Sequence, residues 1–260
     1  MITVFTPTYN RAYLLSNLYE SLAKQTCKDF EWVIVDDGST DDTESLVKQW
    51  LPQADFSIRY KKTVNGGKQR AVNCGVQMAQ GDCFWIVDSD DKLTENAVET
   101  AYKWFDTIKD KQNFAGIAGL RGYSTEKIIG TTFEGEYLDI TCLERVKHNV
   151  NGDKSEIFYT DMLKKFPFPE FEGEKFVPEA LVYNRIAMAG YKMRWFNEIV
   201  YIGDYLPDGY SANVDRLLIS NWKGYSLYVK ELMQSNAPLM AKLIPLAGYI
   251  MRVVKKGLKI

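Results

Sequence analysis

Short apolar runs alternate with segments of helical periodicity through the first half of the chain. Between most of the runs, apolar residues recur every three or four positions, as they do along one face of a helix. Alternating strands and helices predict an α/β fold, with a mostly parallel sheet covered by helices. Ligands of such sheets bind beyond the carboxyl ends of the strands, so the polar residues there are the first candidates for a functional site. The predicted strands are 2–6, 32–36, 56–60, 83–87 and 114–120.

The most acidic of these strand ends is Asp88-Ser89-Asp90-Asp91, directly after the apolar run 83–87. Crowded carboxylates repel one another unless a positive charge lies between them. A hard divalent cation such as Mg²⁺ or Mn²⁺ prefers oxygen ligands and commonly joins protein carboxylates to phosphate oxygens. Taken alone, the four residues are better explained as a solvated acidic turn that caps the next helix. The residues at the other strand ends indicate whether this cluster is a metal site or a helix cap.

Three further segments carry polar residues of unusual kinds. The first predicted strand ends in 6–11, Thr-Pro-Thr-Tyr-Asn-Arg, where the proline fixes the backbone and the tyrosine offers an aromatic face. The second ends in the Asp-Asp pair 36–37, which can accept hydrogen bonds from a nucleobase or a ribose, or cap a helix. After the third comes a glycine-rich loop, 65–75, with Lys68 and Arg70 where a helix begins. Cations there oppose the helix dipole, so a bound anion such as a diphosphate explains them better.

Four motifs occur in a fixed order along the chain: Pro-Thr-Tyr-Asn at 7–10, Val-Asp-Asp-Gly-Ser at 35–39, the basic glycine-rich loop at 65–73 and Val-Asp-Ser-Asp-Asp at 87–91. In this order they resemble a family 2 glycosyltransferase with the GT-A fold. Each motif is weak alone, but several in order, each at a predicted strand end, argue against chance agreement. The resemblance implies a Rossmann-like GT-A domain and an inverting transfer of a sugar from a nucleotide diphosphate, in particular a UDP-sugar, to an acceptor hydroxyl.

The resemblance also implies a cofactor and the roles of single residues. A divalent metal, Mg²⁺ or Mn²⁺, would hold the donor diphosphate and neutralise the charge that grows on the leaving group. Asp37 would accept the N–H of the base and Asp88 would face the ribose or the donor sugar. Asp36 is structural or faces the ribose, and Asp91 is either a further ligand or the helix cap. The implied donor contacts are Thr6, Pro7, Tyr9, Asp37, Lys68, Arg70 and Asp88, and the implied metal ligand is Asp90.

An inverting displacement needs a base that removes the proton of the acceptor hydroxyl, and a carboxylate is the usual candidate. Members of the family place it in a Glu-Asp pair shortly before a helix that ends in Ala-Gly-Tyr. Here Ala-Gly-Tyr stands at 189–191, and the corresponding pair is Pro178-Glu179. The resemblance therefore implies Glu179 as the catalytic base, with a longer side chain than the aspartate of the family. Glu172 and Glu174 are competing candidates, which an exposed acidic loop explains more simply.

The second half of the chain is less regular. Residues 121–165 are rich in aromatic, glycine and charged residues and are predicted to form the wall on the acceptor side. Segment 204–211 resembles the family's loop at the mouth of the site and is either a lid over the donor or a surface turn. His148 has no motif around it and is predicted to be a surface or structural residue. The predicted division is 1–110 for the nucleotide sugar, 111–215 for the acceptor side of the same domain and 216–260 for a C-terminal helical tail.

The predicted tail is apolar and basic. Apolar residues recur between Leu239 and Val254, cations lie among and after them, and Pro245 interrupts the segment. A proline there predicts a bent or broken helix rather than a membrane span. Two explanations stay open. Either the tail rests on an anionic membrane surface, near a lipid-linked acceptor, or its apolar side packs on the domain or on a second copy of the chain.

Composition narrows the class of protein and its compartment. A formal net charge of −2 over 260 residues gives no field that would recruit nucleic acid. The four cysteines include no C-x-x-C pair, so neither a zinc site nor a disulfide framework is expected, and reduced thiols indicate the cytoplasm. No signal-like segment follows Met1. We therefore expect a cytoplasmic protein, at the inner face of the membrane if the tail binds lipid.

Two other functions compete with a glycosyltransferase that acts on a glycan or lipid-linked acceptor in surface or secreted glycan biosynthesis. A sugar nucleotidyltransferase also presents carboxylates and metal to phosphates, but its basic glycine-rich loop follows the first strand, where this chain has 7–10. A non-catalytic nucleotide-sugar-binding protein would keep the donor pocket and lack the base. The missing Glu-Asp pair keeps that alternative open.

Overall fold

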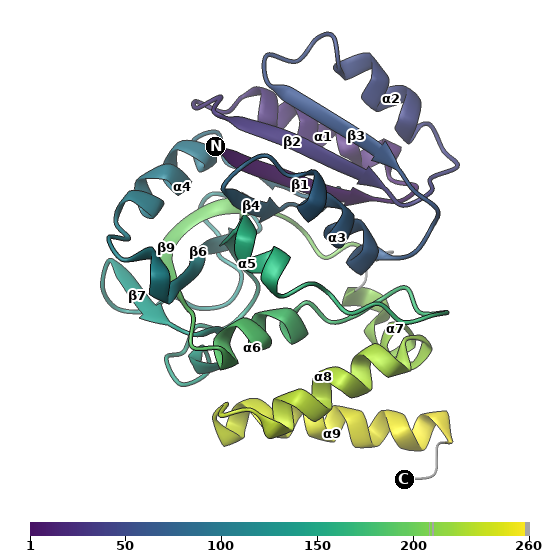
Figure 1. Ribbon diagram of the computed structural model, residues 1–260, viewed down its shortest axis with the longest axis vertical. Helices are drawn as coiled ribbons and strands as arrows, with labels where there is room; N and C mark the ends of the chain where they lie inside the picture. The colour runs from purple at the N-terminus through teal and green to yellow at the C-terminus, as the bar shows by residue number, and fades with distance from the viewer. Residues whose placement is uncertain (208, 210, 258–260) are drawn as a thin grey trace.

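The structure is a computed structural model that describes residues 1–207, 209 and 211–257 (Figure 1). Its first half is a parallel layer in which the strands lie side by side in the order β3-β2-β1-β4. These strands are β1 (Ile2–Thr8), β2 (Phe30–Asp36), β3 (Ser57–Lys62) and β4 (Cys83–Ile86). The helices that connect and follow them are α1 (Ala12–Ala23), α2 (Thr43–Trp50), α3 (Lys68–Met78) and α4 (Ala97–Asp106). The predicted strands and helices of this half are confirmed.

The second half adds strands of mixed direction. β8 (Lys154–Tyr159) runs antiparallel to both β4 and β6 (Phe114–Gly122), and β6 runs parallel to β9 (Lys192–Ile202). The order continues as β4-β8-β6-β9-β5, and β5 (Lys92–Leu93) and β7 (Tyr137–Ile140) are both antiparallel to β9. The α/β prediction is confirmed: β1, β2, β3, β4, β6 and β9 run in one direction, and the antiparallel strands β5, β7 and β8 make the sheet mixed. Antiparallel neighbours need no helical crossover, and turns lead directly into β8.

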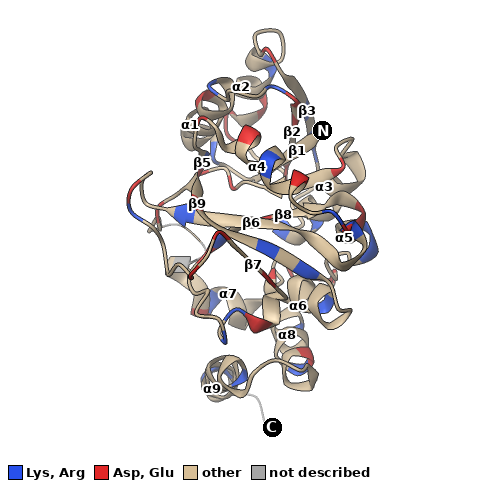
Figure 2. Ribbon diagram, turned by 90° about the vertical axis from the view of Figure 1, so that its left-hand side faces the viewer, with Lys and Arg blue, Asp and Glu red and all other residues tan. Residues whose placement is uncertain are grey.

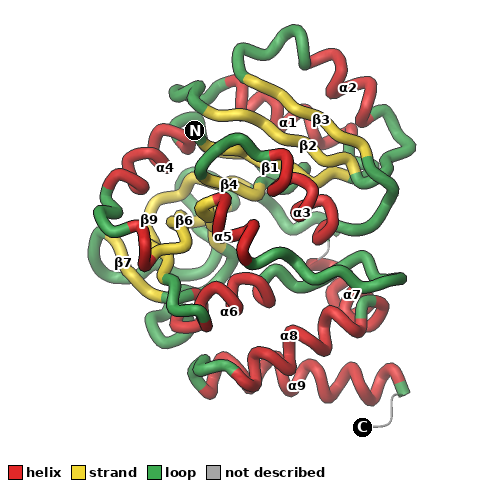
Figure 3. The backbone as a smooth tube through the Cα atoms, viewed as in Figure 1, coloured by secondary structure: helices red, strands yellow, loops and turns green. Residues whose placement is uncertain are grey.

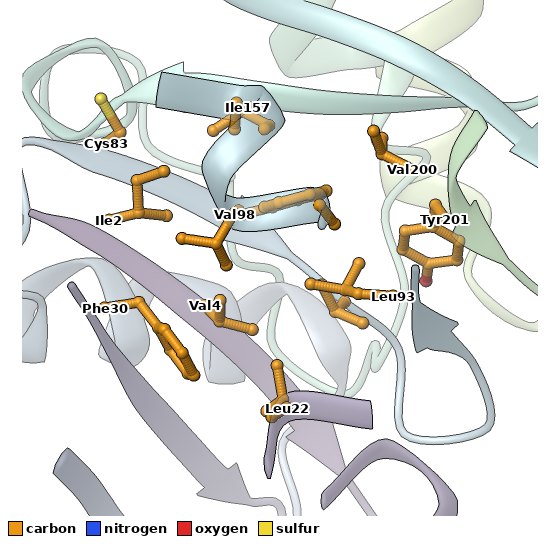
Figure 4. Close-up of a cluster of buried hydrophobic side chains, with 14 of the residues drawn as sticks. Ile2, Val4, Leu22, Phe30, Cys83, Leu93, Val98, Ile157, Val200 and Tyr201 are labelled. Atoms are coloured by element: carbon orange, nitrogen blue, oxygen red, sulfur yellow. The ribbon is translucent and has the colours of Figure 1, made fainter. Parts of the chain in front are cut away.

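Both faces of the sheet are buried, because successive residues of a strand point to opposite sides. Val4 lies in the layer covered by α1, α2 and α4, near Leu22 and Val98 (Figure 4). Phe5 lies in the other layer, where its ring stacks on that of Phe84 at a centroid distance of 5.0 Å. That layer is covered by α3, α5 (Thr160–Lys165) and α6 (Ala180–Met188). Burial on both faces explains why the sequences of the strands are continuous apolar runs.

The C-terminal extension is helical, as predicted, and lies at the lower end of Figure 1. It consists of α7 (Val214–Ser220), α8 (Trp222–Gln234) and α9 (Leu239–Lys256). α9 continues through Pro245, so of the two predicted forms, bent or broken, the broken helix does not occur. A proline removes one backbone hydrogen bond, but α9 is held to α8 on both sides of it. Lys242 Nζ donates to the carbonyl of Ser235, and the rings of Trp222 and Tyr249 stack at 4.9 Å.

Short 3₁₀ turns and loops complete the chain. The 3₁₀ turns are Lys111–Asn113, Cys142–Glu144 and Ser211–Asn213. The connection 166–179, between α5 and α6, is loop and turn throughout (Figure 3). Among the residues that the structure describes, no helix has both the length and the apolar character to cross a bilayer.

Candidate active site

A cavity of about 330 Å³ lies at the carboxyl ends of β1, β2 and β4, where the strand order predicted a ligand site. Its lining combines the turn after β1, the loop after β4 and the segment after β9. Six of the implied site residues line it: Pro7, Tyr9, Asp37, Lys68, Asp88 and Asp90. The structure thus brings together residues that lie far apart in the sequence; Pro7 and Asp90 are separated by 83 positions.

Asp37 holds the glycine-rich loop at the entrance to α3. Its Oδ1 accepts the N–H of Gly66 at 2.7 Å and its Oδ2 accepts the N–H of Gly67 at 2.8 Å. Gly67 has φ +95°, and a Cβ there would lie 1.9 Å from the carbonyl oxygen of Lys175, so only glycine fits. Burial raises the pKa of Asp37 despite these backbone bonds. A carboxylate has about four acceptor sites, so Asp37 can still receive a base N–H.

Asp36, beside it, is a structural residue. Its Oδ1 accepts the N–H of Ser39 at 2.7 Å and its Oδ2 accepts the hydroxyl of Tyr60 at 2.6 Å. The side chain is fully buried and does not line the cavity. Of the two roles considered for Asp36, the structure favours the structural one.

Lys68 joins the acidic cluster to the implied base. Its Nζ lies 2.6 Å from Oδ1 of Asp88 and 2.8 Å from Oε1 of Glu179. Burial alone would lower the pKa of Lys68, but the two carboxylates raise it well above its usual range. Glu179 stands at the N-terminus of α6 and does not itself line the cavity. The structure therefore places Glu179 one side chain away from the cavity wall.

The loop 88–91 is held by groups from the far end of the sheet. The hydroxyl of Tyr201 accepts the N–H of Asp88 at 3.0 Å and donates to Oδ2 of Asp91 at 2.6 Å. Nη2 of Arg121 donates to the same oxygen at 2.9 Å. Burial raises the pKa of Asp91 to about 7, against the opposing effect of Arg121. Asp91 therefore fixes the loop, and the explanation of it as a cap is wrong, because α4 begins only at Ala97.

Arg121 and Tyr201 were missed by sequence reasoning, although a signal was present. Both stand near the carboxyl ends of strands, β6 and β9, that run parallel to β4 and end at the same edge of the sheet. Arg121 lines the cavity, and its Nε is buried with no hydrogen-bond partner in the described part of the chain. The rule that singled out the first strand ends would have found both residues if it had been applied to the second half.

The carboxylates of the cavity fit a metal that takes part of its coordination from the substrate. Asp90 lines the cavity, and burial together with the nearby Asp88 raises the pKa of its carboxyl group, which a cation there would reverse. In the described residues, no group of three or more His, Cys, Asp or Glu side chains could hold a metal alone. Mg²⁺ is commonly bound by one or two carboxylates plus substrate phosphates. This donor set would fit a metal that is shared with a diphosphate.

Two implied donor contacts do not reach the cavity lining. Thr6 is fully buried, and its Oγ1 accepts the indole N–H of Trp32 at 2.9 Å. Arg70 points along the loop between α5 and α6, where Nη1 donates to the carbonyl of Glu174 and Nη2 to that of Phe171, both at 2.7 Å. Both side chains have structural partners, so we assign neither of them to the donor.

The three glutamates considered as the catalytic base have different surroundings. Glu174 is buried, and its Oε1 and Oε2 accept the N–H groups of Lys223 at 2.7 Å and Gly224 at 2.9 Å, where α8 begins. It therefore caps a helix instead of lying in an exposed loop. Glu172 is exposed and does not line the cavity. Glu179 is the member of this group that contacts a cavity residue.

The segment after β9 forms part of the cavity wall. Asp204, Tyr205, Leu206 and Gly209 line it, and the hydroxyl of Tyr205 donates to Oδ2 of Asp153 at 2.8 Å. Positions 208 and 210 of the segment 204–211 lie outside the described residues. The described part places this segment at the site and not on a remote surface.

His148 lies away from the cavity. It is partly buried in the turn that follows the 3₁₀ turn Cys142–Glu144, and its backbone N–H donates within that turn. It does not line the cavity. This position is consistent with the predicted surface or structural role.

Residues 3–200 match the model of Glycosyl transferase family 2. The chain belongs to this family. The enzyme is therefore a glycosyltransferase, which agrees with the cavity of carboxylates and basic loop described above and excludes the sugar nucleotidyltransferase. Its relatives include "Glycosyltransferase GlyG" of Streptococcus pneumoniae serotype 4, 38% identical over 222 residues, which are 79% of this chain and 69% of GlyG.

The glycosyltransferase also resembles TarS, a poly(ribitol-phosphate) β-N-acetylglucosaminyltransferase of Staphylococcus aureus. The two are 28% identical over 204 residues, which are 75% of this chain and 35% of TarS. The crystal structure of TarS 1–349 in complex with UDP-GlcNAc has a TM-score of 0.69 at 21% identity, and covers 98% of this chain and 72% of that chain. PcManGT from Pyrobaculum calidifontis, in complex with GDP-Man and Mn²⁺, has a TM-score of 0.65 at 20% identity. The match covers 97% of this chain and 73% of PcManGT. These likenesses confirm the GT-A fold.

Proposed function

We propose that this glycosyltransferase moves a sugar from a UDP-sugar to an acceptor hydroxyl, with inversion and with the help of a divalent metal. The observation that carries the proposal is the single cavity in which Asp37, Asp88 and Asp90 meet, with Lys68 leading from Asp88 to Glu179. TarS 1–349 in complex with UDP-GlcNAc shares the fold and supports a UDP-sugar donor. PcManGT in complex with GDP-Man and Mn²⁺ shares the fold and supports the metal.

Each part of the cavity has its own task in this mechanism. Pro7, Tyr9 and Asp37 bind the base, and Lys68 and Asp88 orient the diphosphate and the donor sugar. Asp90 would hold the metal, Mg²⁺ or Mn²⁺, and a metal there would neutralise charge on the leaving diphosphate. Glu179 shares the Nζ of Lys68 with Asp88. It takes the proton of the acceptor hydroxyl as the new glycosidic bond forms on the face of the sugar opposite the leaving diphosphate.

The acceptor class follows from the relatives. We propose a glycan or lipid-linked acceptor in cell-surface glycan assembly, because TarS acts on poly(ribitol-phosphate) and another relative is named "Minor teichoic acid biosynthesis protein GgaB". Residues 1–110 then carry the nucleotide sugar, and 111–215 carry the acceptor side of the same domain. Residues 216–260 form the tail. We expect no nucleic-acid partner, given the net charge of −2.

A thermal-shift screen of nucleotide sugars tests the donor class. A donor at one hundred times its Kd adds about 2.7 kcal/mol to the free energy of unfolding, which raises Tm by roughly 5–10 °C in a chain of this size. We expect UDP-sugars with Mn²⁺ or Mg²⁺ to give the largest rise, and the rise to shrink when EDTA removes the metal. An equal rise with ADP- and GDP-sugars, or no rise with any of them, would contradict the proposal.

The outer face of α9 is the basis for a second proposal, on membrane contact. One side of the helix packs on α8 through Leu246 and Tyr249, whereas the other side is exposed and apolar. α9 contains no acidic residue, and its cations are among the blue segments of Figure 2. The exposed apolar residues are Leu239, Met240, Leu243, Ile244, Ile250, Met251 and Val254. We propose that this face rests on an anionic membrane at the cytoplasmic side.

Flotation with vesicles that contain phosphatidylglycerol tests the contact. The full chain is expected to float, and Ile244→Ser with Met251→Ser to lower the bound fraction at least about tenfold, because each buried CH₂ contributes about 0.8 kcal/mol. Val64→Ser is the matched control, since Val64 is 93% exposed on a loop outside the tail. Equal flotation of the double variant would refute the contact. If the chain forms a dimer and the same double variant dissociates it, this face binds a second copy of the chain instead.

A further inference from the structure

Lys68 contacts both the donor side and the base side of the site. Its Nζ lies 2.6 Å from Oδ1 of Asp88, which lines the cavity, and 2.8 Å from Oε1 of Glu179, which does not. The three residues come from α3, from the loop after β4 and from the start of α6. The side chain of Lys68 is 17% exposed, so water and salt screen these charges only in part. One ammonium group therefore serves two carboxylates.

The contact with Lys68 restrains Glu179. The ion pair holds its Oε1 at 2.8 Å from the Nζ of Lys68. A general base must come within hydrogen-bond distance of the proton that it removes. While an oxygen of Glu179 stays on Lys68, this carboxylate is less free to meet an acceptor hydroxyl.

A diphosphate in the cavity competes for the same ammonium group. Lys68 lines the cavity in the first turn of α3, an 11-residue helix whose N-terminal amides and dipole favour anions. A diphosphate carries more charge than one carboxylate and offers an ammonium group more acceptor oxygens. Contact between Lys68 and the diphosphate thus draws the ammonium away from Glu179.

We propose that Lys68 couples the two substrates: it holds Glu179 until the diphosphate of the donor replaces that carboxylate as its partner, and so frees the base only when the donor is bound. The inference rests on the proposed function and adds a second role for Lys68, as a positioning residue for the base. Donor binding then precedes productive acceptor binding. By thermodynamic linkage, the contact that the diphosphate displaces also lowers the affinity for the donor.

A zero-length cross-linker tests this coupling in the unaltered full chain. A water-soluble carbodiimide activates a carboxylate, and a lysine in contact attacks the activated carbon to form an amide, with release of the urea. We expect a Lys68–Glu179 amide in peptide mass maps. Saturating UDP with Mn²⁺ is expected to lower its yield about fivefold or more, because a ligand shifts the population toward the state that it prefers. The matched control is the pair Lys28–Asp55, 3.1 Å apart and outside the cavity, whose yield stays the same.

The outcomes separate this inference from the proposed function. An unchanged Lys68–Glu179 yield at a UDP concentration that does raise Tm would overturn the coupling alone. So would the absence of this amide in a sample where the Lys28–Asp55 amide forms. A failure of UDP with Mn²⁺ to raise Tm would contradict the proposed function, and the coupling with it.

Discussion

Glu179→Gln is expected to slow donor turnover by about 10²- to 10⁴-fold, the usual contribution of a general base. The amide keeps the size of the side chain but cannot take a proton. Because Glu179 does not line the cavity and reaches it through Lys68, UDP binding should not weaken. The measurement is the release of UDP from the UDP-sugar that gives the largest thermal shift, with UDP binding followed by the same shift.

Two neighbouring glutamates serve as controls for this variant. Glu172→Gln should keep full turnover, because that side chain is exposed in the same connection and does not line the cavity. Glu174→Gln should lower the free energy of unfolding by about 1 kcal/mol through loss of a helix cap, and leave turnover at saturating donor intact. Glu179→Gln with turnover within about twofold of the unaltered chain would remove Glu179 from the mechanism.

The strand ends were predictable because the chain encodes them locally. The apolar run before Asp88 is long enough to be a buried strand, and a parallel sheet brings the ends of β1, β2 and β4 to one edge. Strand periodicity and parallel order therefore sufficed to place Pro7, Asp37 and Asp90 in one cavity. The direction of β8 was not predictable, because the loop before it carries no helical crossover pattern that would signal a parallel strand.

The misplaced contacts share one cause: their partners lie far away along the chain. Arg70 follows a glycine-rich loop, as an anion-binding residue would, yet its guanidinium binds carbonyls about a hundred positions downstream, at Phe171 and Glu174. Glu174 in turn caps a helix that begins at Trp222. A local motif indicates that a polar side chain is needed, but tertiary packing decides which group satisfies it.

Asp90→Asn is expected to lower metal-dependent donor turnover at least about 100-fold, equivalent to about 2.7 kcal/mol of transition-state stabilisation. The amide keeps the shape of the side chain but loses the charge that a divalent metal requires. Asp82→Asn is the matched control, because Asp82 lies at the other end of β4 with its side chain 88% exposed. Its ion pair with the N-terminal amine is a surface contact and contributes little to stability.

Release of UDP from a UDP-sugar by the unaltered chain, with Mn²⁺ and then with EDTA, decides whether this cavity performs metal-dependent sugar transfer. We expect release with Mn²⁺, loss of release when EDTA removes the metal, and the same loss in Asp90→Asn but not in Asp82→Asn. Equal release with and without metal, or release by Asp90→Asn at the rate of the unaltered chain, would contradict the role of Asp90 and the proposed mechanism.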